Sequence, residues 1–377
     1  MHNRPIVNKD HPSSRAGVIR KARNQAIHPV ANPAVSKIIA PAFARLFLPS
    51  TVKELARLRA AENMTSEEIK VEQAKMLRLI VTWSYDTVPY YRDSMDMVGV
   101  SPDEIRSVED LTRLPILTKR DIQESPERFL PTQANPGDMK HTVTSGTTGT
   151  PLNLYRDRRV DPLGQATWWQ ILDWVGAGPF DPVLYLMLQP SRDRSHRTRK
   201  PAPRNLIRAV KGAEYLPIDL LLERKTREVL DWVEKANPVV ITGYPSLLHI
   251  LAQMVIQSGS SLRARPIAVF YHSEQMADDT RILIQEAFQV PILSRYGAME
   301  FSAMVAYTCP QGKWHVNSQG FIIEIVDGEF GNRTGEPANH GRIIITDLRN
   351  HVMPILRYEI GDIGWTKAAV ARCTCGR

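Results

Sequence analysis

The sequence predicts an α/β fold in which a parallel β-sheet is followed by a smaller antiparallel β subdomain. Between residues 237 and 300, short apolar runs alternate with amphipathic helical patterns, which is typical of βαβ units. Beyond residue 319, three strand patterns follow one another with no helix between them. The composition agrees, because 43% of the 377 residues are hydrophobic and 23% are charged, as in an ordinary globular protein.

The first part of the chain shows a basic extension and then a helical region. Residues 1–45 are rich in Arg, Pro, Asn and Ala and form an irregular arm or a short helical extension, so we place the extension at 1–60. Thr65 stands three residues before Glu68, the spacing of a capping box that begins a helix. Prolines in VPYYRD (88–93) and LPILTKRDI (114–122) predict helix stops or strand starts.

The central part of the chain, residues 61–318, is the predicted α/β core. Strands are expected at the apolar runs PVVITGY, IAVFYH and PILSRYG, with helices from 246 to 257 and from 277 to 288. Ligands of such sheets bind at the carboxyl ends of the parallel strands. Tyr244, the stretch from His272 to Glu274 and the stretch from Tyr296 to Glu300 should therefore line one rim.

The last part, residues 319–377, is the predicted antiparallel subdomain. Its strands are GFIIEIV (320–326), GRIIITDL (341–348) and PILRYEI (354–360), which Gly-, Pro- and Asn-containing turns separate.

Charge and cysteine content exclude several classes of protein. The net charge is +8, yet most basic excess lies in residues 1–50 and 191–212, so no nucleic-acid-binding surface is expected across the fold. No apolar run is long enough to span a membrane. Three cysteines and no secretory apolar segment at the N-terminus predict a reduced, cytoplasmic protein.

The strongest local signal is TVTSGTTGTPLNLYRD at 142–157, which reads as a phosphate-binding loop. Glycines let the backbone approach an oligophosphate, and hydroxyl groups complete the donor shell. The spacing of a Walker loop and its Lys are absent. A flexible hairpin turn is the alternative. The candidate phosphate ligands are Ser145, Gly146, Thr147, Thr148 and Gly149.

Three motifs, in the same order along the chain, resemble those of the adenylate-forming enzymes. This superfamily contains the acyl-CoA synthetases, the luciferases and the adenylation domains of peptide synthetases. The three motifs are the Thr/Gly loop, RYGAMEF at 295–301 and RYEIGDIG at 357–364. Within that superfamily the chain is similar to the phenylacetate-CoA ligase branch and its capsular-polysaccharide-associated relatives, over roughly residues 70–377. The resemblance implies the large domain of an adenylate-forming ligase.

The resemblance also assigns roles to single residues. Thr147 and Glu300 are the catalytic candidates, and Glu300 is the expected Mg²⁺ ligand, since a carboxylate is a suitable hard oxygen donor. Tyr296, with Gly297, is expected beside the adenine of ATP or AMP, and Asp362 at the ribose hydroxyls. A surface charge, a core aromatic residue and an ordinary turn are the alternatives at Glu300, Tyr296 and Asp362.

Two further groups are expected near the acid substrate. Ser273 and Glu274 correspond to the segment that lines the acyl and adenosine pockets in these enzymes. Tyr244, Phe270 and His272 are candidates for the walls of the acid-binding cavity, with core packing as the alternative. A general-base role for His272 is not favoured, because an ionised carboxylate attacks without losing a proton.

Cys309, His315, Cys373 and Cys375 form a candidate Cys₃His zinc site. Glycines soon after the cysteines permit tight turns whose N–H groups point at sulfur. The alternative is three unrelated reduced cysteines and a surface histidine. Such a zinc ion would be structural, and it would tie the chain end to the antiparallel subdomain.

The predicted activity is ATP-dependent activation of a small carboxylic acid, an aryl or arylacetic acid by resemblance, with transfer to CoA or another thiol or amine. The resemblance implies a C-terminal lid with an adenylation lysine, and the sequence stops before the matching position, so we expect impaired turnover. The basic segment 191–204 is either a solvated loop or a site for CoA phosphates, an anionic substrate or a carrier protein. A second copy of this chain, in a homodimer, is a further candidate partner. The alternatives are a catalytically silent nucleotide-binding or carrier-interacting protein and a kinase-like phosphotransferase, against which the missing phosphate-binding Lys counts.

Overall fold

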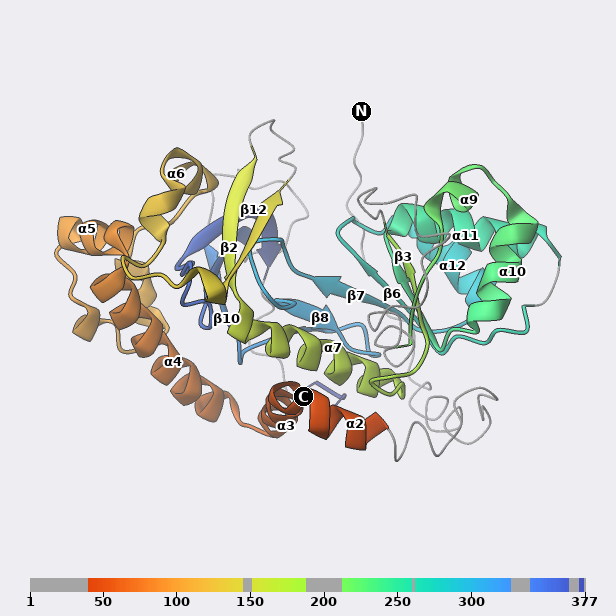
Figure 1. Ribbon diagram of the computed structural model, residues 1–377, viewed down its shortest axis with the longest axis horizontal. Helices are drawn as coiled ribbons and strands as arrows, with labels where there is room; N and C mark the ends of the chain where they lie inside the picture. The colour runs from red at the N-terminus through yellow and green to blue at the C-terminus, as the bar shows by residue number, and fades with distance from the viewer. Residues whose placement is uncertain are drawn as a thin grey trace.

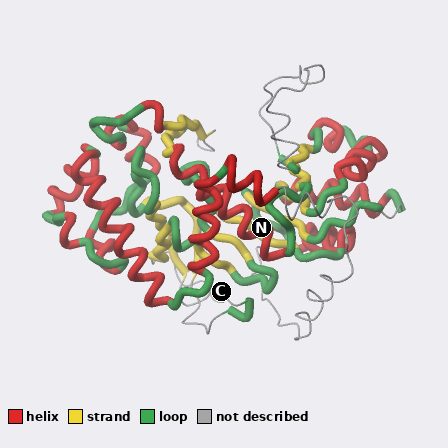
Figure 2. Tube along the Cα trace, turned by 60° about the horizontal axis from the view of Figure 1, so that its bottom comes forward, coloured by secondary structure: helices red, strands yellow, loops and turns green. Residues whose placement is uncertain are grey.

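The structure is a computed structural model that describes residues 40–144, 151–187, 212–259, 262–326, 340–365 and 373–375. Its β-sheets occupy the middle of the molecule, and groups of helices lie at both ends (Figures 1 and 2). In the described ranges, no helix has the length and apolar character needed to cross a membrane.

A seven-stranded sheet forms the centre, in the order β4-β3-β5-β6-β7-β8-β9. The strands from β4 to β7 pair in parallel, whereas β8 and β9 extend the sheet in antiparallel fashion. This confirms the predicted parallel α/β core. The strands are β3 (Val183–Leu186), β4 (Ala213–Tyr215), β5 (Val240–Gly243), β6 (Ala268–His272), β7 (Ile292–Tyr296), β8 (Ala306–Thr308) and β9 (Trp314–Val316).

Helices cover both faces of the parallel strands, as apolar side chains on both faces require. On one face, a buried cluster joins strands to helices α9 (Ile218–Leu222), α10 (Thr226–Ala236), α11 (Pro245–Gln257) and α12 (Asp278–Phe288). On the other face, α7 (Asp161–Val175) packs its apolar side chains against the same strands. The bounds of α11 and α12 agree with the predicted helices to within one residue.

A second, three-stranded antiparallel sheet has the order β10 (Phe321–Val326), β11 (His340–Asp347) and β12 (Tyr358–Trp365). The predicted antiparallel arrangement is therefore confirmed. The third strand begins four residues later than the pattern PILRYEI indicated. Arg357 has a left-handed backbone with φ of 51°, which regular strand pairing does not allow at that position.

The helices between residues 66 and 124 lie at the end of the molecule opposite α9 to α12, whereas those between residues 40 and 61 lie beside α7 (Figure 1). Thr65 caps α4 through the predicted capping box, with the Glu68 N–H 3.2 Å from the Thr65 hydroxyl oxygen. Pro89 occupies the first turn of α5, where a missing N–H costs nothing. These α-helices are α2 (Ala40–Phe47), α3 (Pro49–Ala61), α4 (Ser66–Thr87), α5 (Pro89–Val98) and α6 (Lys119–Glu124). Short 3₁₀ helices occur in the connections between α5 and α7: η2 (Pro102–Glu104), η3 (Glu109–Arg113), η4 (Pro126–Phe129), η5 (Pro136–Asp138) and η6 (Arg158–Val160).

Helix α3 lies inside the predicted N-terminal extension, yet it packs against the core. Leu55 and Leu58 of α3 are buried in the same cluster as Trp169 of α7, and Gln170 of α7 donates to the Leu58 carbonyl at 3.3 Å. Residues 1–39 fall outside the described ranges. The domain boundary at residue 60 stays a prediction.

Candidate functional site

The segment predicted to hold phosphate connects two paired strands. β1 (Met139–Thr144) and β2 (Leu152–Asp157) form an antiparallel hairpin in which Thr144 is opposite Leu152. Arg156 of β2 donates to the carbonyl of Phe301 at 3.3 Å, so the hairpin lies beside the segment that follows β7. The predicted phosphate ligands lie in residues 145–150, outside the described ranges, and their role stays a prediction.

Two hydrogen bonds join the end of β7 to strand β12. The hydroxyl of Tyr296 donates to Oδ2 of Asp362 at 2.7 Å. Four residues after Tyr296, Oε1 of Glu300 accepts from the hydroxyl of Tyr358 at 3.1 Å. Three predicted site residues from distant parts of the sequence therefore meet in one place.

The two tyrosines are held as neutral donors. Burial, followed by the neighbouring Asp362, raises the pKa of Tyr296 above its ordinary value. Burial, followed by Glu300, does the same for the pKa of Tyr358, whose side chain is 1% exposed. Each phenol thus fixes the orientation of one carboxylate. Asp362 itself is exposed and Glu300 is half-buried, so both carboxylates lie at the surface of the fold.

Gly297 lies where the backbone packs closely against the side chain of Met304. A Cβ at this position would be 3.3 Å from the sulfur of Met304, closer than an ordinary contact. The glycine therefore lets the segment after Tyr296 pack tightly against Met304. Its predicted place beside adenine stays a prediction.

Of the residues predicted to wall the acid cavity, Tyr244 directly follows β5, His272 ends β6, and Phe270 is in the middle of β6. The rings of Tyr244 and His272 are 5.2 Å apart and edge-on. Phe270 is fully buried and its ring is 5.5 Å from that of Trp168, so its packing is that of a core residue. Burial, and then Arg295, lower the pKa of His272 to about 3, which keeps its imidazole neutral at neutral pH.

Ser273 and Glu274 follow β6 at the same rim. Ser273 has φ of 66°, a left-handed conformation that is uncommon for residues other than glycine and is often found at functional sites. Glu274 accepts from the backbone N–H and from the hydroxyl of Ser246, each at 3.0 Å. Its carboxylate therefore caps the N-terminus of α11, which has no cap from its own N-cap residue. The predicted contact of both residues with ligand stays a prediction.

Arg295 is a polar residue of this region that was not among the predicted site residues. It belongs to β7, directly before Tyr296, and its guanidinium carbon lies 4.5 Å from the centre of the Trp168 ring. The signal in the sequence was a basic residue inside the otherwise apolar strand pattern PILSRYG.

A second constellation brings the three cysteines and one histidine together. Cys309 follows β8, His315 belongs to β9, and Cys373 and Cys375 are in the short described segment near the chain end. All four ligand atoms lie within 4.8 Å of one another. Burial raises the pKa of the Cys309 thiol to about 11, and N–H groups of Lys313 and Gln311 oppose this shift.

The spacing fits a tetrahedral zinc ion. Zn–S bonds of about 2.3 Å and Zn–N bonds of about 2.0 Å place two ligand sulfurs roughly 3.8 Å apart and a sulfur and a nitrogen roughly 3.5 Å apart. The sulfurs of Cys309 and Cys373 are 3.9 Å apart, and the Cys375 sulfur is 3.4 Å from Nε2 of His315. The donor set is that of closed structural zinc sites.

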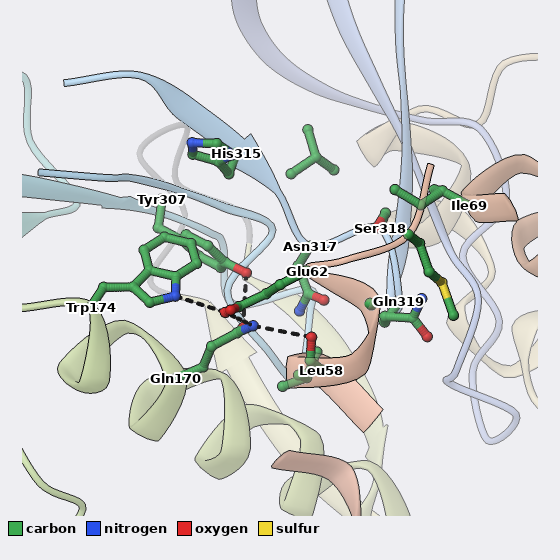
Figure 3. A pocket seen from close by; sticks show the side chains of 13 residues that line it. Leu58, Glu62, Ile69, Gln170, Trp174, Tyr307, His315, Asn317, Ser318 and Gln319 are labelled. Carbon is green, nitrogen blue, oxygen red and sulfur yellow. Dashed lines mark hydrogen bonds between the residues drawn. The ribbon is translucent and has the colours of Figure 1, made fainter. Parts of the chain in front are cut away.

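A pocket of about 110 Å³ lies beside this cluster, between the α3–α4 connection, α7 and β9 (Figure 3). His315 contributes to both the pocket and the cluster. Oε1 of Glu62 accepts from Gln170 at 2.7 Å and from Trp174 at 2.8 Å, which ties α3 to α7. The pocket contains neither Tyr296 nor Asp362, so it is separate from the residues at the end of β7.

Comparisons with known proteins identify relatives. No family model matches the chain. A phenylacetate-coenzyme A ligase of Thermus thermophilus is 26% identical over 335 residues, covering 84% of this chain and 69% of the relative. The chain is similar in sequence to phenylacetate-CoA ligases. The protein CapK of Staphylococcus aureus is 28% identical over 134 residues, or 34% of this chain and 27% of CapK. The predicted resemblance to this branch of the adenylate-forming enzymes is therefore confirmed.

The fold is also that of a solved adenylate-forming ligase. An open conformation of 2-hydroxyisobutyryl-CoA ligase, in complex with 2-HIB-AMP and CoA, matches with a TM-score of 0.65 at 18% identity. The match covers 84% of this chain and 73% of that chain. It confirms the predicted α/β fold class.

Proposed function

We propose that this chain binds ATP with Mg²⁺ and a small carboxylic acid, and that it forms an acyl-adenylate with release of pyrophosphate. The observation that carries the proposal is the pair of hydrogen bonds between the end of β7 and β12, Tyr296 to Asp362 and Tyr358 to Glu300. The relatives, named as phenylacetate-coenzyme A ligases, support an aryl or arylacetic acid and transfer to CoA.

Each carboxylate would take a role that suits its surroundings. Asp362 is exposed at the strand and would accept hydrogen bonds from two ribose hydroxyl groups. Glu300 would hold the magnesium ion, because a carboxylate is the oxygen ligand that Mg²⁺ prefers. That ion, once bound, neutralises charge that develops at the α-phosphate. Tyr296 would lie beside the base, and the Thr/Gly loop, at Thr147, would complete the phosphate site.

We also propose that Cys309, His315, Cys373 and Cys375 hold a structural zinc ion, on the strength of the ligand distances above. The ion would join β8 and β9 to the segment 373–375, away from the acid and the nucleotide. CoA or a carrier protein as acceptor, the homodimer and the cytoplasmic location remain predictions.

A carboxylate-panel ATP–pyrophosphate exchange assay tests the proposed reaction. In a form of the protein that includes the lid implied by the resemblance, we expect at least one carboxylic acid to support exchange. Glu300→Gln should reduce that exchange by about 100-fold or more, because a metal ligand at the reacting phosphate is lost. Glu359→Gln is the matched control, since Glu359 lies on β12 and pairs with Arg342 at 2.7 Å.

Two results would contradict the proposed reaction. AMP binding without exchange for any acid would favour the catalytically silent nucleotide-binding protein. ADP as the product would favour a phosphotransferase.

A further inference from the structure

Arg295 is a largely buried cation without an acidic partner. Its Nη2 donates to the hydroxyl of Thr242 at 2.9 Å, and its Nε is buried with no hydrogen-bond partner. Across the described ranges, no carboxylate forms an ion pair with it. Burial lowers the pKa of Arg295 to about 10, so the guanidinium is still charged at neutral pH. A buried charge without a partner lowers the stability of the fold unless a ligand supplies the opposite charge.

His272 adds a second unpartnered polar atom beside this cation. His272 and Arg295 are register partners on β6 and β7, so their side chains lie on the same face of the sheet. Nδ1 of His272 is 2.9 Å from the Ser273 hydroxyl, whereas Nε2 is buried without a partner. Since its imidazole is neutral, His272 adds no second positive charge beside Arg295 and contributes a hydrogen-bonding group.

The surroundings of the two residues are aromatic. Strand registers place Tyr185, Thr242 and Phe270 in one row on the face that carries Arg295. Trp168 of α7 stacks on the guanidinium, and Tyr244 contacts the His272 ring. A ligand in this place would meet apolar rings along its body and, at one end, a cation whose Nε has no hydrogen-bond partner.

The carboxylate of the acid that reacts with ATP is expected away from Arg295. Tyr296 follows Arg295 in the strand, and because successive side chains point to opposite faces, the two residues lie on opposite faces of β7. Tyr296 contacts Asp362, and the proposed magnesium ligand Glu300 follows it. The carboxylate that reacts with ATP must reach the Glu300 side, which leaves Arg295 for another group of the same molecule.

We propose that Arg295 binds a second carboxylate of the acid that this chain activates, so that the preferred substrate is a dicarboxylic acid with an apolar or aromatic body. This inference rests on the proposed function and narrows its substrate class. Arg295 is a specificity residue in this proposal: its planar fork pairs with the distal carboxylate, and His272 offers a further hydrogen bond.

The test compares matched acids by equilibrium binding to the full chain in the presence of AMP and Mg²⁺. Terephthalate is paired with benzoate, and straight-chain dicarboxylates of four to eight carbons are paired with monocarboxylates of equal length. For the best pair, we expect the wild type to bind the dicarboxylate at least about tenfold more tightly, the scale of one charged hydrogen bond. Arg295→Gln should bring the ratio close to one, and Arg295→Lys should give an intermediate ratio.

Arg281→Gln is the control, because Arg281 also lies over an aromatic ring, that of Tyr271 at 5.7 Å, but comes from α12 on the other side of the sheet. The preference of Arg281→Gln for the dicarboxylate over the monocarboxylate should match that of the wild type. The ratio in the wild type tests the inference even if Arg295→Gln does not fold.

Three results would overturn this inference. In the first, each pair of acids binds equally to the wild type, which leaves the proposed function intact. In the second, Arg295→Gln weakens both members of a pair by the same factor, which would assign Arg295 to the reacting carboxylate. In the third, no acid binds although AMP does, and the proposed function falls as well.

Discussion

Asp347 is a buried carboxyl group that makes the stability of the fold depend on pH. Its side chain is 1% exposed, Oδ1 accepts from the Arg349 N–H at 2.8 Å, and Oδ2 is buried without a partner. Burial raises its pKa from 3.8 to about 6. Between these values the folded state holds a proton that the unfolded state has lost, so the stability that the protonated form provides falls as pH rises through this window.

Asp347→Asn tests whether the stability of the fold falls as pH rises through this window. The amide keeps an oxygen acceptor and carries no charge, so the free energy of unfolding of the variant should rise relative to that of the wild type as pH rises from 4 to 7. The gain in the free energy of unfolding should be of the order of 1 to 3 kcal/mol. Urea unfolding of both proteins at several pH values measures it. A difference that is constant across this range would contradict the raised pKa.

At the scale of single elements, the cluster of three cysteines and one histidine brings the segment 373–375 next to strands β8 and β9. The four residues are separated in sequence by up to 66 positions, from Cys309 to Cys375. The residue types indicated the site, because cysteine and histidine are zinc ligands whatever the intervening fold. The distances could come only from the folded chain, since CxC spacing alone does not fix which residues meet.

Zinc occupancy should stabilise the native state. An ion that binds only the folded chain raises its stability by mass action. Purified protein should contain about one equivalent of zinc, and a chelator should lower the melting temperature by several degrees. Cys375→Ser should lose the zinc and become insensitive to the chelator, whereas Gln311→Ala, an exposed residue of the same turn, should behave as the wild type. Zinc below a tenth of an equivalent would rule the site out.

Sequence patterns predicted some elements well and others not at all. The runs at β5, β6 and β7 and the helices after β5 and β6 have the length and periodicity that identify buried strands and amphipathic helices. β4, β8 and β9 have three residues each, too few to show an alternation, and they were not predicted. Their pairing depends on neighbours in the sheet, which local pattern does not contain.

At the scale of the whole molecule, the site depends on contacts between β7 and β12 that span more than 50 residues of sequence. Motif resemblance selected Tyr296, Glu300 and Asp362 from their letters and order. The hydrogen bonds that join them follow from how the two sheets pack, which no single motif determines. Arg295 was missed for the same reason, since its unpaired state becomes visible only when the surrounding residues are in place.

The proposed nucleotide site is tested most directly by the affinity of the full chain for AMP, measured by titration calorimetry with three proteins. The wild type should bind one AMP, and Asp362→Asn should weaken binding by roughly 10- to 100-fold, because a carboxylate that accepts hydrogen bonds loses its charge. Glu359→Gln, three residues away on the same strand, should bind like the wild type. Equal affinity of the wild type and Asp362→Asn for AMP, or no binding of AMP at all, would contradict the nucleotide site at the end of β7.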